Sequence, residues 1–596
     1  MAEPALLPVP REVEPRPGAL LLGEHGPRVE ASVRPEAGLP AQGFELELSP
    51  EGIRIHAADG PGLRYAERLL DQLLSQAEGP LPARLIRDWP DFPVRGYMLD
   101  ISRNRVPTQE SLRELVTVLA ELRINQLQLY TEHTFAYEDH RTVWEGASPV
   151  TPDEIRELDH LCREHSIELV PNQNSFGHME RWLRHAAYAE RAELAADETP
   201  RAPSCLAPTD ANAAFMHGLY RELLPNFTSR QINIGCDETW DLGRGQSREA
   251  CEARGTGRVY LEFLRRLMDP LRAEGRTVQF WGDIVQRYPE LVQELPQSEV
   301  LALVWGYEAP LDPDELPAEI RDAIEKLGIP SSFLLGFEGA LGPFADREIP
   351  FYVCPGTSAW NSLIGRLPNA RANLLDAAVC GERAGARGYL VTDWGDNGHL
   401  QPPCVGLTAL AYGAAVSWCR ATNAGLDDKQ LAAGLDAAVF RDPTGRTGRA
   451  LVELGSLYEP LGLRSLNATA TALALMAPLR PDGASNFFQS WWGETSRARI
   501  EASVGQLDQI AREVSAARPA TGDLLSREIA QAARLARHGL WRVSHRALGE
   551  GPSFQDLRRD LEQGIEEQAR VWKARSRPGG LDDTLERLRQ ALRDYD

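Results

Sequence analysis

The spacing of hydrophobic positions changes twice along the 596-residue chain, and the changes divide it into three parts. In residues 44–57 apolar and polar positions alternate on both sides of Ser49-Pro-Glu-Gly52, which predicts a β-hairpin. Residues 62–76 then carry leucines and alanines at helical spacing. We therefore expect a small α+β domain over residues 1–92.

From Arg95 onward short apolar runs alternate with helical patterns such as 109–122 and 152–164, the latter with Thr151 as N-cap. Eight such units over roughly 300 residues predict a (β/α)8 TIM barrel, here over residues 93–430. A doubly wound sheet competes, but no glycine-rich phosphate loop follows the first strand. The predicted strands are 96–102, 126–131, 168–172, 231–235, 277–281, 300–305, 351–354 and 389–392.

After about residue 430 the strand-like runs end, and the remaining apolar patterns are those of amphipathic helices. No repeat of fixed period is visible, which argues against a repeat array. We expect a helical C-terminal domain over residues 431–596. Its predicted helices are 431–440, 449–461, 498–517, 526–543 and 553–572.

The composition limits which partners the protein is expected to bind and in which compartment it is expected to act. The formal charge of −22, from 64 basic and 86 acidic residues, argues against binding nucleic acid or anionic membranes. The first residues lack the basic and apolar regions of a signal peptide, and no apolar run is long enough to span a bilayer. The eight cysteines have no Cys-x-x-Cys spacing. These features favour a cytoplasmic protein, and they allow a homo-oligomer.

Acidic, amide and aromatic residues follow nearly every predicted barrel strand. The carboxyl ends of barrel strands meet at one face, where active sites form. Aromatic rings stack on sugars, while carboxylates and arginines bind hydroxyls. A lone aspartate here is often only a helix cap, but the whole set indicates a carbohydrate site. The strand-end residues are Asp100, Arg103, Tyr130, Glu132, Asn172, Asn174, His178, Asp237, Glu238, Trp281, Asp283, Trp305, Tyr307, Glu308, Tyr352, Trp360, Trp394 and Asp396.

Asp237 and Glu238 end the predicted fourth strand, and paired carboxylates suit acid/base chemistry on a sugar. The three other Asp-Glu pairs have a proline or a predicted helix start nearby, so an N-terminal helical turn is their simpler interpretation. Neighbouring strand residues point to opposite faces, so both carboxylates face the barrel axis only if the strand has ended by Asp237. Gly235 permits such an ending.

The sequence gives little support for a metal site or for a serine nucleophile. The twelve histidines include no His-x-His and no His-Glu-x-x-His, and the chain has no Gly-x-Ser-x-Gly. We expect no metal and no cofactor.

Four segments resemble glycoside hydrolase family 20, the β-N-acetylhexosaminidases. The resemblance covers about residues 1–420, and its most specific element is the Asp-Glu pair on the fourth strand. The segments are Arg95-Gly-Tyr-Met-Leu-Asp-Ile-Ser-Arg103, Asn174-Ser-Phe-Gly-His178, Ile234-Gly-Cys-Asp-Glu238 and Tyr389-Leu-Val-Thr-Asp-Trp-Gly-Asp396.

The resemblance implies exo-acting, retaining hydrolysis of terminal N-acetylhexosamine, in which the substrate's own 2-acetamido oxygen is the nucleophile and an oxazolinium ion forms. Glu238 would be the general acid/base, and Asp237 would orient the acetamido group. The substrate would be a small glycoside or an oligosaccharide. The implied binding residues are Arg103 and Asp396 for hydroxyls, Tyr352 for the acetamido oxygen, His178 as a relay to the pair, and Trp281, Trp305 and Trp394 around the sugar. From the strand-end pattern we add Glu132, Asp283 and Trp360 to the predicted binding residues.

The sequence departs from the family pattern in ways that indicate a divergent subgroup. Asn233-Ile-Gly-Cys236 replaces the usual His-x-Gly-Gly, and Asp396 stands where glutamate is commoner. The shorter carboxylate leaves the choice between N-acetylglucosamine and N-acetylgalactosamine open. Two alternatives also stay open: a two-carboxylate retaining glycosidase acting on non-acetamido sugars, with Glu132 or Asp283 as nucleophile, and an inactive sugar-binding homologue.

Overall fold

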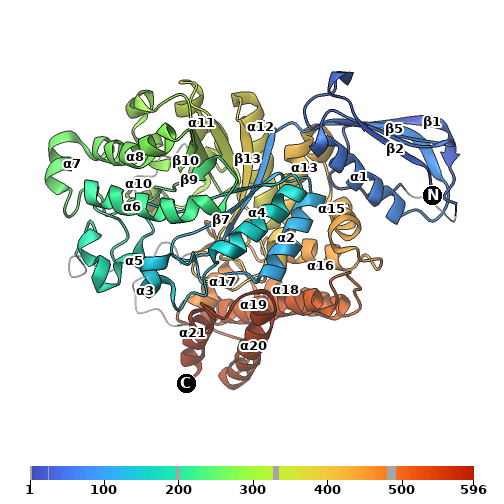
Figure 1. Cartoon of the computed structure of the whole chain (residues 1–596). Coiled ribbons are helices and arrows are strands. Elements are labelled where there is room, and N and C mark those ends of the chain that lie inside the picture. Colours follow the sequence, from blue (N-terminus) through green and yellow to red (C-terminus); the bar gives the residue numbers. More distant parts are fainter. Residues whose placement is uncertain (1–2, 24–25, 196–201, 327–333, 480–490) are drawn as a thin grey trace.

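A computed structural model describes residues 3–23, 26–195, 202–326, 334–479 and 491–596 of the chain. It shows a small sheet domain beside a barrel, with a layer of helices below the barrel (Figure 1). Within the described ranges no helix combines the length and the apolar character needed to cross a bilayer.

The N-terminal sheet has five strands in the order β1-β5-β3-β4-β2. The predicted hairpin is confirmed, because β3 and β4 pair antiparallel on either side of the turn at residues 50–51. Helix α1 (Gly60–Ser75) is capped by Asp59 and buries Tyr65, Leu69 and Leu73 against the sheet. The strands are β1 Glu12–Leu20, β2 Val29–Val33, β3 Phe44–Ser49, β4 Gly52–Ala57 and β5 Leu81–Asp88.

The central unit confirms the predicted barrel. Eight parallel strands run in the order β8-β7-β6-β13-β12-β11-β10-β9, and a parallel bridge between Asn172 and Asn233 joins the two ends. All eight lie where the sequence predicts a strand, with bounds that differ by a few residues. They are β6 Val94–Asp100, β7 Gln126–Tyr130, β8 Glu168–Val170, β9 Gln231–Asn233, β10 Thr277–Trp281, β11 Val300–Trp305, β12 Phe351–Cys354 and β13 Gly388–Asp393.

Helices surround the barrel and fix where its loops begin. Thr151 is the predicted N-cap of α4, and a capping box with Glu154 confirms it. The main helices are α2 Gln109–Glu121, α4 Pro152–Glu164, α6 Asp210–Leu223, α8 Thr256–Ala273, α11 Phe337–Ala345, α12 Leu367–Ala384 and α13 Leu407–Trp418; short ones are α3 Arg141–Trp144, α5 Glu180–Leu183, α7 Arg248–Arg254, α9 Asp283–Arg287, α10 Ala318–Lys326 and α14 Arg420–Asn423.

The interior of the barrel contains a buried amide network. Gln128 donates to Gln279 at 2.8 Å and accepts from Asn172 at 3.1 Å and from Asn233 at 3.0 Å. Buried amides are stable only when hydrogen-bonded, so each strand must keep its register for the others to be satisfied. The network gives the loops above it a fixed base.

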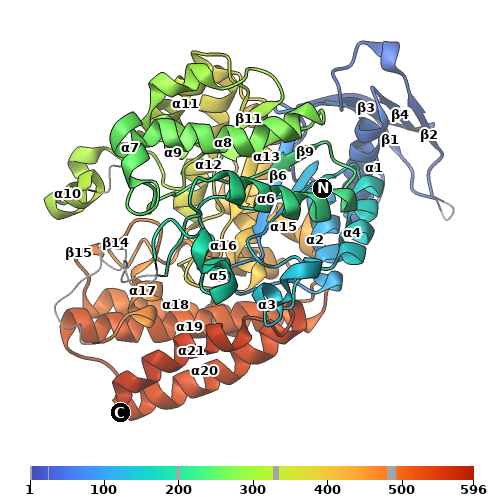
Figure 2. The same ribbon diagram turned by 60° about the vertical axis from the view of Figure 1, so that its left-hand side comes forward.

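The C-terminal helices pack directly on the barrel (Figure 2). One hydrophobic cluster runs from Leu127 of β7 to Leu588 of α21, so these helices share most of their core with the barrel, beside a small cluster of their own around Trp572. Arg577 donates to Glu154 at 2.9 Å across the contact. The helices are α15 Asp428–Leu435, a π-helical turn at 436–440, α16 Thr447–Ser456, α17 Ala470–Met476, α18 Arg497–Val514, α19 Asp523–Leu548, α20 Phe554–Arg575 and α21 Leu581–Leu592.

The expectation that strands end after about residue 430 is wrong in one detail. β14 (Leu463–Arg464) pairs antiparallel with β15 (Trp492–Gly493). Two-residue strands leave no alternating pattern in the sequence, which is why they were not predicted. Helices α17 and α21 were also not predicted.

Candidate active site

The carboxylate pair lies on a sharp turn at the end of β9. The strand stops at Asn233, and Gly235, Cys236 and Glu238 all adopt left-handed backbone angles, with φ of +69°, +73° and +47°. The prediction that the strand ends before Asp237 is therefore confirmed. The turn frees both carboxylates from the alternation of a strand, so that they face the same space.

Asn174, after β8, holds this turn in place. Its side-chain oxygen accepts the backbone N–H of Cys236 at 3.1 Å, and its amide nitrogen donates to Asp237 Oδ1 at 3.0 Å. A Cβ on Gly235 would lie 2.4 Å from Asn174 Oδ1, so a larger residue would push the two loops apart. A single amide thus sets both the backbone and the carboxylate.

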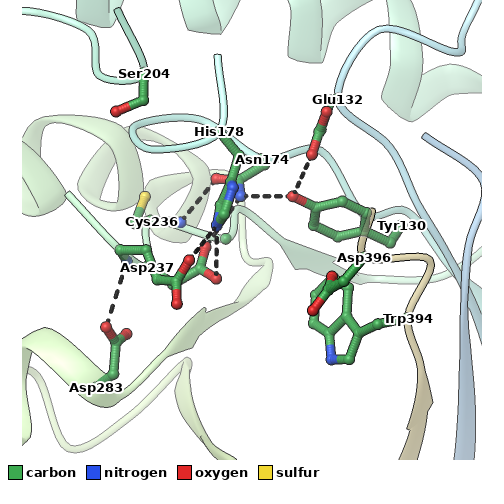
Figure 3. Close-up of polar contacts among 12 residues, drawn as sticks. Tyr130, Glu132, Asn174, His178, Ser204, Cys236, Asp237, Asp283, Trp394 and Asp396 are labelled. Atoms are coloured by element: carbon green, nitrogen blue, oxygen red, sulfur yellow. Dashed lines mark hydrogen bonds and ion pairs between the residues drawn. The ribbon is translucent and has the colours of Figure 1, made fainter. Parts of the chain in front are cut away.

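His178 lies against both carboxylates (Figure 3). Its Nε2 is 3.4 Å from Asp237 Oδ2 and 3.3 Å from Glu238 Oε2. Burial would lower the pKa of His178, but the charge of Asp237 and hydrogen bonds to both acids raise it well above its usual value. Burial would raise the pKa of Asp237, but His178 and Asn174 hold it below its usual value. Asp237 is therefore ionised at neutral pH.

The two carboxylates differ in access. The side chain of Asp237 is 8% exposed, whereas that of Glu238 is 36% exposed. A buried, ionised group can stabilise positive charge in a fixed place, and an accessible one can exchange a proton with a leaving group or water.

Arg103, in the loop after β6, lies beside the histidine, with its Nη2 3.4 Å from His178 Nδ1. It pairs with Asp100 at 2.9 Å and with Asp396 at 3.6 Å. Its guanidinium lies against the rings of Tyr130, at 5.2 Å, and Trp394, at 4.9 Å, which contact each other edge-to-face. Burial would lower the pKa of Arg103, but the surrounding acids raise it well above its usual value, so the cation is permanent.

Glu132 and Asp283 are buried carboxyl groups at the edge of the same space. Tyr130 donates to Glu132 at 3.0 Å, and Asp283, the first residue of α9, accepts the backbone N–H of Glu238 at 3.3 Å. Burial is the main cause that raises the pKa of Glu132 to about 7 and that of Asp283 to about 8.

Aromatic side chains form one wall of the site, which we call the aromatic wall: Trp305, Tyr307, Trp360 and Trp394. Trp394 donates its indole N–H to Tyr307 Oη at 2.7 Å, and Trp305 stacks on Tyr307 at 5.2 Å. Trp360 contacts the same tyrosine edge-to-face at 5.1 Å. Tyr307 is therefore the centre of the wall.

Three buried polar atoms near this wall have no hydrogen-bond partner among the residues that the structure describes. They are Nε1 of Trp281, Nε1 of Trp305 and Oδ1 of Asp283. Trp281 in turn lies 5.8 Å from Trp394. Buried polar atoms are costly to leave unpaired, so these atoms suit a polar ligand.

The structure contradicts the predicted role of Tyr352 at the acetamido group. Its ring lies against Gly388, the first residue of β13, and beside Gln126 and Gln231, the first residues of β7 and β9. These residues mark the amino end of the barrel, away from the carboxylate pair. Tyr352 is only the second residue of β12, so its side chain points into the interior before the strand reaches the active face.

Tyr307, unlike Tyr352, presents its hydroxyl at the active face of the barrel. It lies two residues beyond the end of β11, and its hydroxyl accepts from Trp394 in the aromatic wall. The sequence placed Tyr307 among the strand-end residues, but the family resemblance gave the role to Tyr352. The remaining predicted residues, from Arg103 to Asp396, come from strand ends and loops at the same end of the barrel.

Comparisons with known proteins agree with this geometry. Residues 92–315 match the catalytic domain of glycosyl hydrolase family 20, and residues 24–89 match domain 2 of that family. The chain is 29% identical to human hexosaminidase D over 266 residues, which are 42% of this chain and 52% of that protein. It is 30% identical to bovine hexosaminidase D over 214 residues, 34% and 59% of the two chains. It thus matches a little over half the length of these relatives.

Solved structures share the fold. A β-N-acetylhexosaminidase from Bacteroides fragilis has a TM-score of 0.53 at 18% identity, covering 71% of this chain and 92% of that one. A Flavobacterium johnsoniae chitobiase has a TM-score of 0.57 at 16% identity, covering 98% and 99%. The second likeness includes the C-terminal helices.

Proposed function

We propose that this chain, whose barrel and N-terminal sheet carry the catalytic domain and domain 2 of glycosyl hydrolase family 20, is an exo-acting, retaining β-N-acetylhexosaminidase. The observation that carries the proposal is the contrast within the pair: Asp237 is buried and ionised, while Glu238 is accessible and contacts the same histidine. One acid is suited to hold a positive charge, and the other to move a proton.

In the proposed first step, the 2-acetamido oxygen of the substrate forms a bond to the anomeric carbon, and the bond from that carbon to the leaving oxygen breaks. Glu238 gives its proton to the leaving oxygen. Asp237 accepts the acetamido N–H and stabilises the positive charge of the oxazolinium ion. Because Asn174 and His178 fix Asp237 beforehand, no reorganisation is needed when the charge develops.

In the second step, Glu238 takes a proton from water, and the water oxygen bonds to the anomeric carbon. The bond to the acetamido oxygen breaks, the acetamido group is restored, and Glu238 is again protonated. Two displacements at one carbon give retention of configuration. The residual N-acetylhexosamine then leaves the site.

Substrate contacts follow from the other groups around the site. Arg103 and Asp396 suit the ring hydroxyls, since a guanidinium donates and a carboxylate accepts. Tyr307 suits the acetamido oxygen, because its own oxygen already accepts from Trp394 and its proton can be donated. Substrates are therefore glycosides or oligosaccharides that end in N-acetylglucosamine, N-acetylgalactosamine or both.

The titration of the other acids disfavours the two-carboxylate alternative. An enzyme nucleophile must be ionised, and the pKa values of Glu132 and Asp283 are raised to about 7 and about 8. At neutral pH Asp283 is mostly protonated and Glu132 is half protonated. The substrate's own acetamido group is a nucleophile that needs no ionisation.

We also propose that the enzyme acts in the cytoplasm. All eight cysteines are buried and none forms a disulfide, which is the usual state in a reducing compartment.

The decisive experiment compares aryl N-acetylglucosaminide and N-acetylgalactosaminide with the corresponding aryl glucoside and galactoside. Turnover of the acetamido substrates alone, with inhibition by a thiazoline mimic of the oxazolinium ion, is the expected result. Turnover of the glucoside or galactoside without thiazoline inhibition would support the two-carboxylate mechanism instead. The ratio of the two acetamido substrates gives the sugar preference directly.

A further inference from the structure

Asn467, in the C-terminal region, contacts the aromatic wall directly. It lies between β14 and α17, and its side-chain oxygen accepts the indole N–H of Trp360 at 2.8 Å across 107 residues of sequence. Trp360 is 1% exposed, so this hydrogen bond is shielded from water. Among the described residues, the side chain of Asn467 is therefore the only hydrogen-bond acceptor for the indole N–H of Trp360.

The loop around Asn467 is itself held by the barrel. The backbone N–H of Asn467 donates to Glu308 Oε1 at 2.7 Å, and Glu308 forms two hydrogen bonds with Arg366, at 2.8 and 2.7 Å. Asn361 Nδ2 donates to the carbonyl oxygen of Asn467 at 3.3 Å. Contacts from the loops after β11 and β12 therefore fix the position of this one amide. Its backbone angle, φ +53°, is one that asparagine and glycine tolerate best.

From Asn467 and Trp360, three further contacts lead to Arg103 at the catalytic face. Trp360 packs edge-to-face on Tyr307 at 5.1 Å, and Trp394 donates to Tyr307 at 2.7 Å. Trp394 then lies under the guanidinium of Arg103 at 4.9 Å. Both rings also pack on the backbone of Gly356, since a Cβ there would lie 2.5 Å from Trp360 and 2.9 Å from Tyr307. Because the two rings contact each other and share this backbone contact, we expect a rotation of Trp360 to displace Tyr307.

We propose that Asn467 is a positioning residue for the hydrolase reaction: it fixes Trp360, and through it sets the place of the Tyr307 hydroxyl at the acetamido group. The inference rests on the proposed function. It gives the C-terminal region a part in catalysis, since a barrel without residues 463–470 lacks the acceptor that orients its aromatic wall.

The test uses the full chain with Asn467→Gly, which keeps the backbone angle and removes the amide, and Trp360→Phe, which keeps an aromatic ring but removes the N–H donor and part of the indole surface. Each variant is expected to lower kcat on an aryl N-acetylhexosaminide about 10-fold to 100-fold with little change in KM, because a misplaced group acts mainly on the transition state. The double variant should lose no more than Trp360→Phe alone, since that variant already lacks the donor to Asn467.

The matched control is Trp572→Phe, which removes another buried indole hydrogen bond of the C-terminal helices, to Arg577 O at 3.0 Å. It should keep the wild-type kcat. A purely structural role for Asn467 would instead lower the melting temperature and leave kcat per folded enzyme unchanged, which would overturn the proposal. So would additive losses in the double variant.

A spectroscopic readout separates this inference from the proposed function. The indole N–H signals of Trp360 and Trp394 are assigned by NMR from Trp360→Phe and Trp394→Phe. Asn467→Gly should move both signals, because Tyr307 links the two rings; movement of the Trp360 signal alone would overturn the positioning role. If the wild-type protein hydrolyses no N-acetylhexosaminide, the proposed function fails, while this measurement still decides whether Asn467 sets the aromatic wall.

Discussion

His178 Nε2 lies 3.3 Å from Glu238 Oε2, and the same nitrogen lies 3.4 Å from Asp237 Oδ2. One imidazole therefore contacts both acids, whose negative charges would otherwise repel each other. It stabilises the ionised form of Asp237, the group that must carry negative charge throughout the reaction.

Removing that cation should change the pH profile. In His178→Gln the pKa of Asp237 is expected to rise, because its main favourable charge is lost while its burial remains. The acidic limb of kcat/KM against pH should then move to higher pH. An unmoved limb together with a large loss at all pH values would show that His178 does not act through Asp237.

Replacing the general acid should produce a loss that depends on the leaving group. Glu238→Gln cannot protonate the leaving oxygen, so a disaccharide substrate should lose about 100-fold or more in kcat. An aryl glycoside with an acidic phenol leaves without full protonation and should lose less in the first step. Equal losses on both substrates would contradict the role of Glu238.

Removing the negative charge beside the acetamido group should lower the chemical step. Asp237→Asn keeps the size of the side chain but cannot stabilise the oxazolinium ion, and kcat is expected to fall about 100-fold to 1,000-fold. The measurement is steady-state kinetics with an aryl N-acetylhexosaminide. A change in KM alone would instead indicate a role in ground-state binding.

The same substitution at Tyr307 and at Tyr352 compares the two ends of the barrel. Tyr307→Phe removes a hydroxyl from the aromatic wall, and a loss of about 10-fold in kcat is expected, equivalent to one hydrogen bond. Tyr352→Phe removes a hydroxyl at the amino end of the barrel and should keep kcat while lowering the melting temperature. The reverse pattern would restore Tyr352 as the acetamide partner.

Asp283 should make stability depend on pH. Burial raises its pKa to about 8 in the folded protein, against about 4 when unfolded, so the folded state holds a proton that the unfolded state releases between these values. The wild type therefore loses stability as pH rises from about 4 to 8, a loss that Asp283→Asn avoids. The melting temperature of the variant should exceed that of the wild type by more at pH 8 than at pH 5; a difference independent of pH would refute this.

Part of the site can be predicted from the sequence, because it depends on residues that are close together along the chain. Gly235 before Asp237 indicated that the strand ends there, and the structure places both carboxylates on the resulting turn. The alternation of apolar runs and helical patterns likewise predicted the barrel, since the period of a strand or helix is set by its own residues. These features depend on a few neighbours along the chain.

The height of a side chain along the barrel axis cannot be predicted from such local signals. It depends on where its strand begins and ends and on the register with the neighbouring strands. Tyr352 and Tyr307 both belong to strand-end patterns, but β12 extends two residues past Tyr352, whereas β11 stops two residues before Tyr307. The resemblance selected the wrong tyrosine for that reason.

The sequence by itself determined the barrel and the acid pair on its fourth strand, because both follow from spacing over a few residues. Only the tertiary structure decided which tyrosine faces the site and that Asn467 completes its aromatic wall. The contact between Trp360 and Asn467 joins residues 107 positions apart, and no local pattern of hydrophobic and polar residues carries information over that distance. Packing of the C-terminal helices on the barrel brings them together.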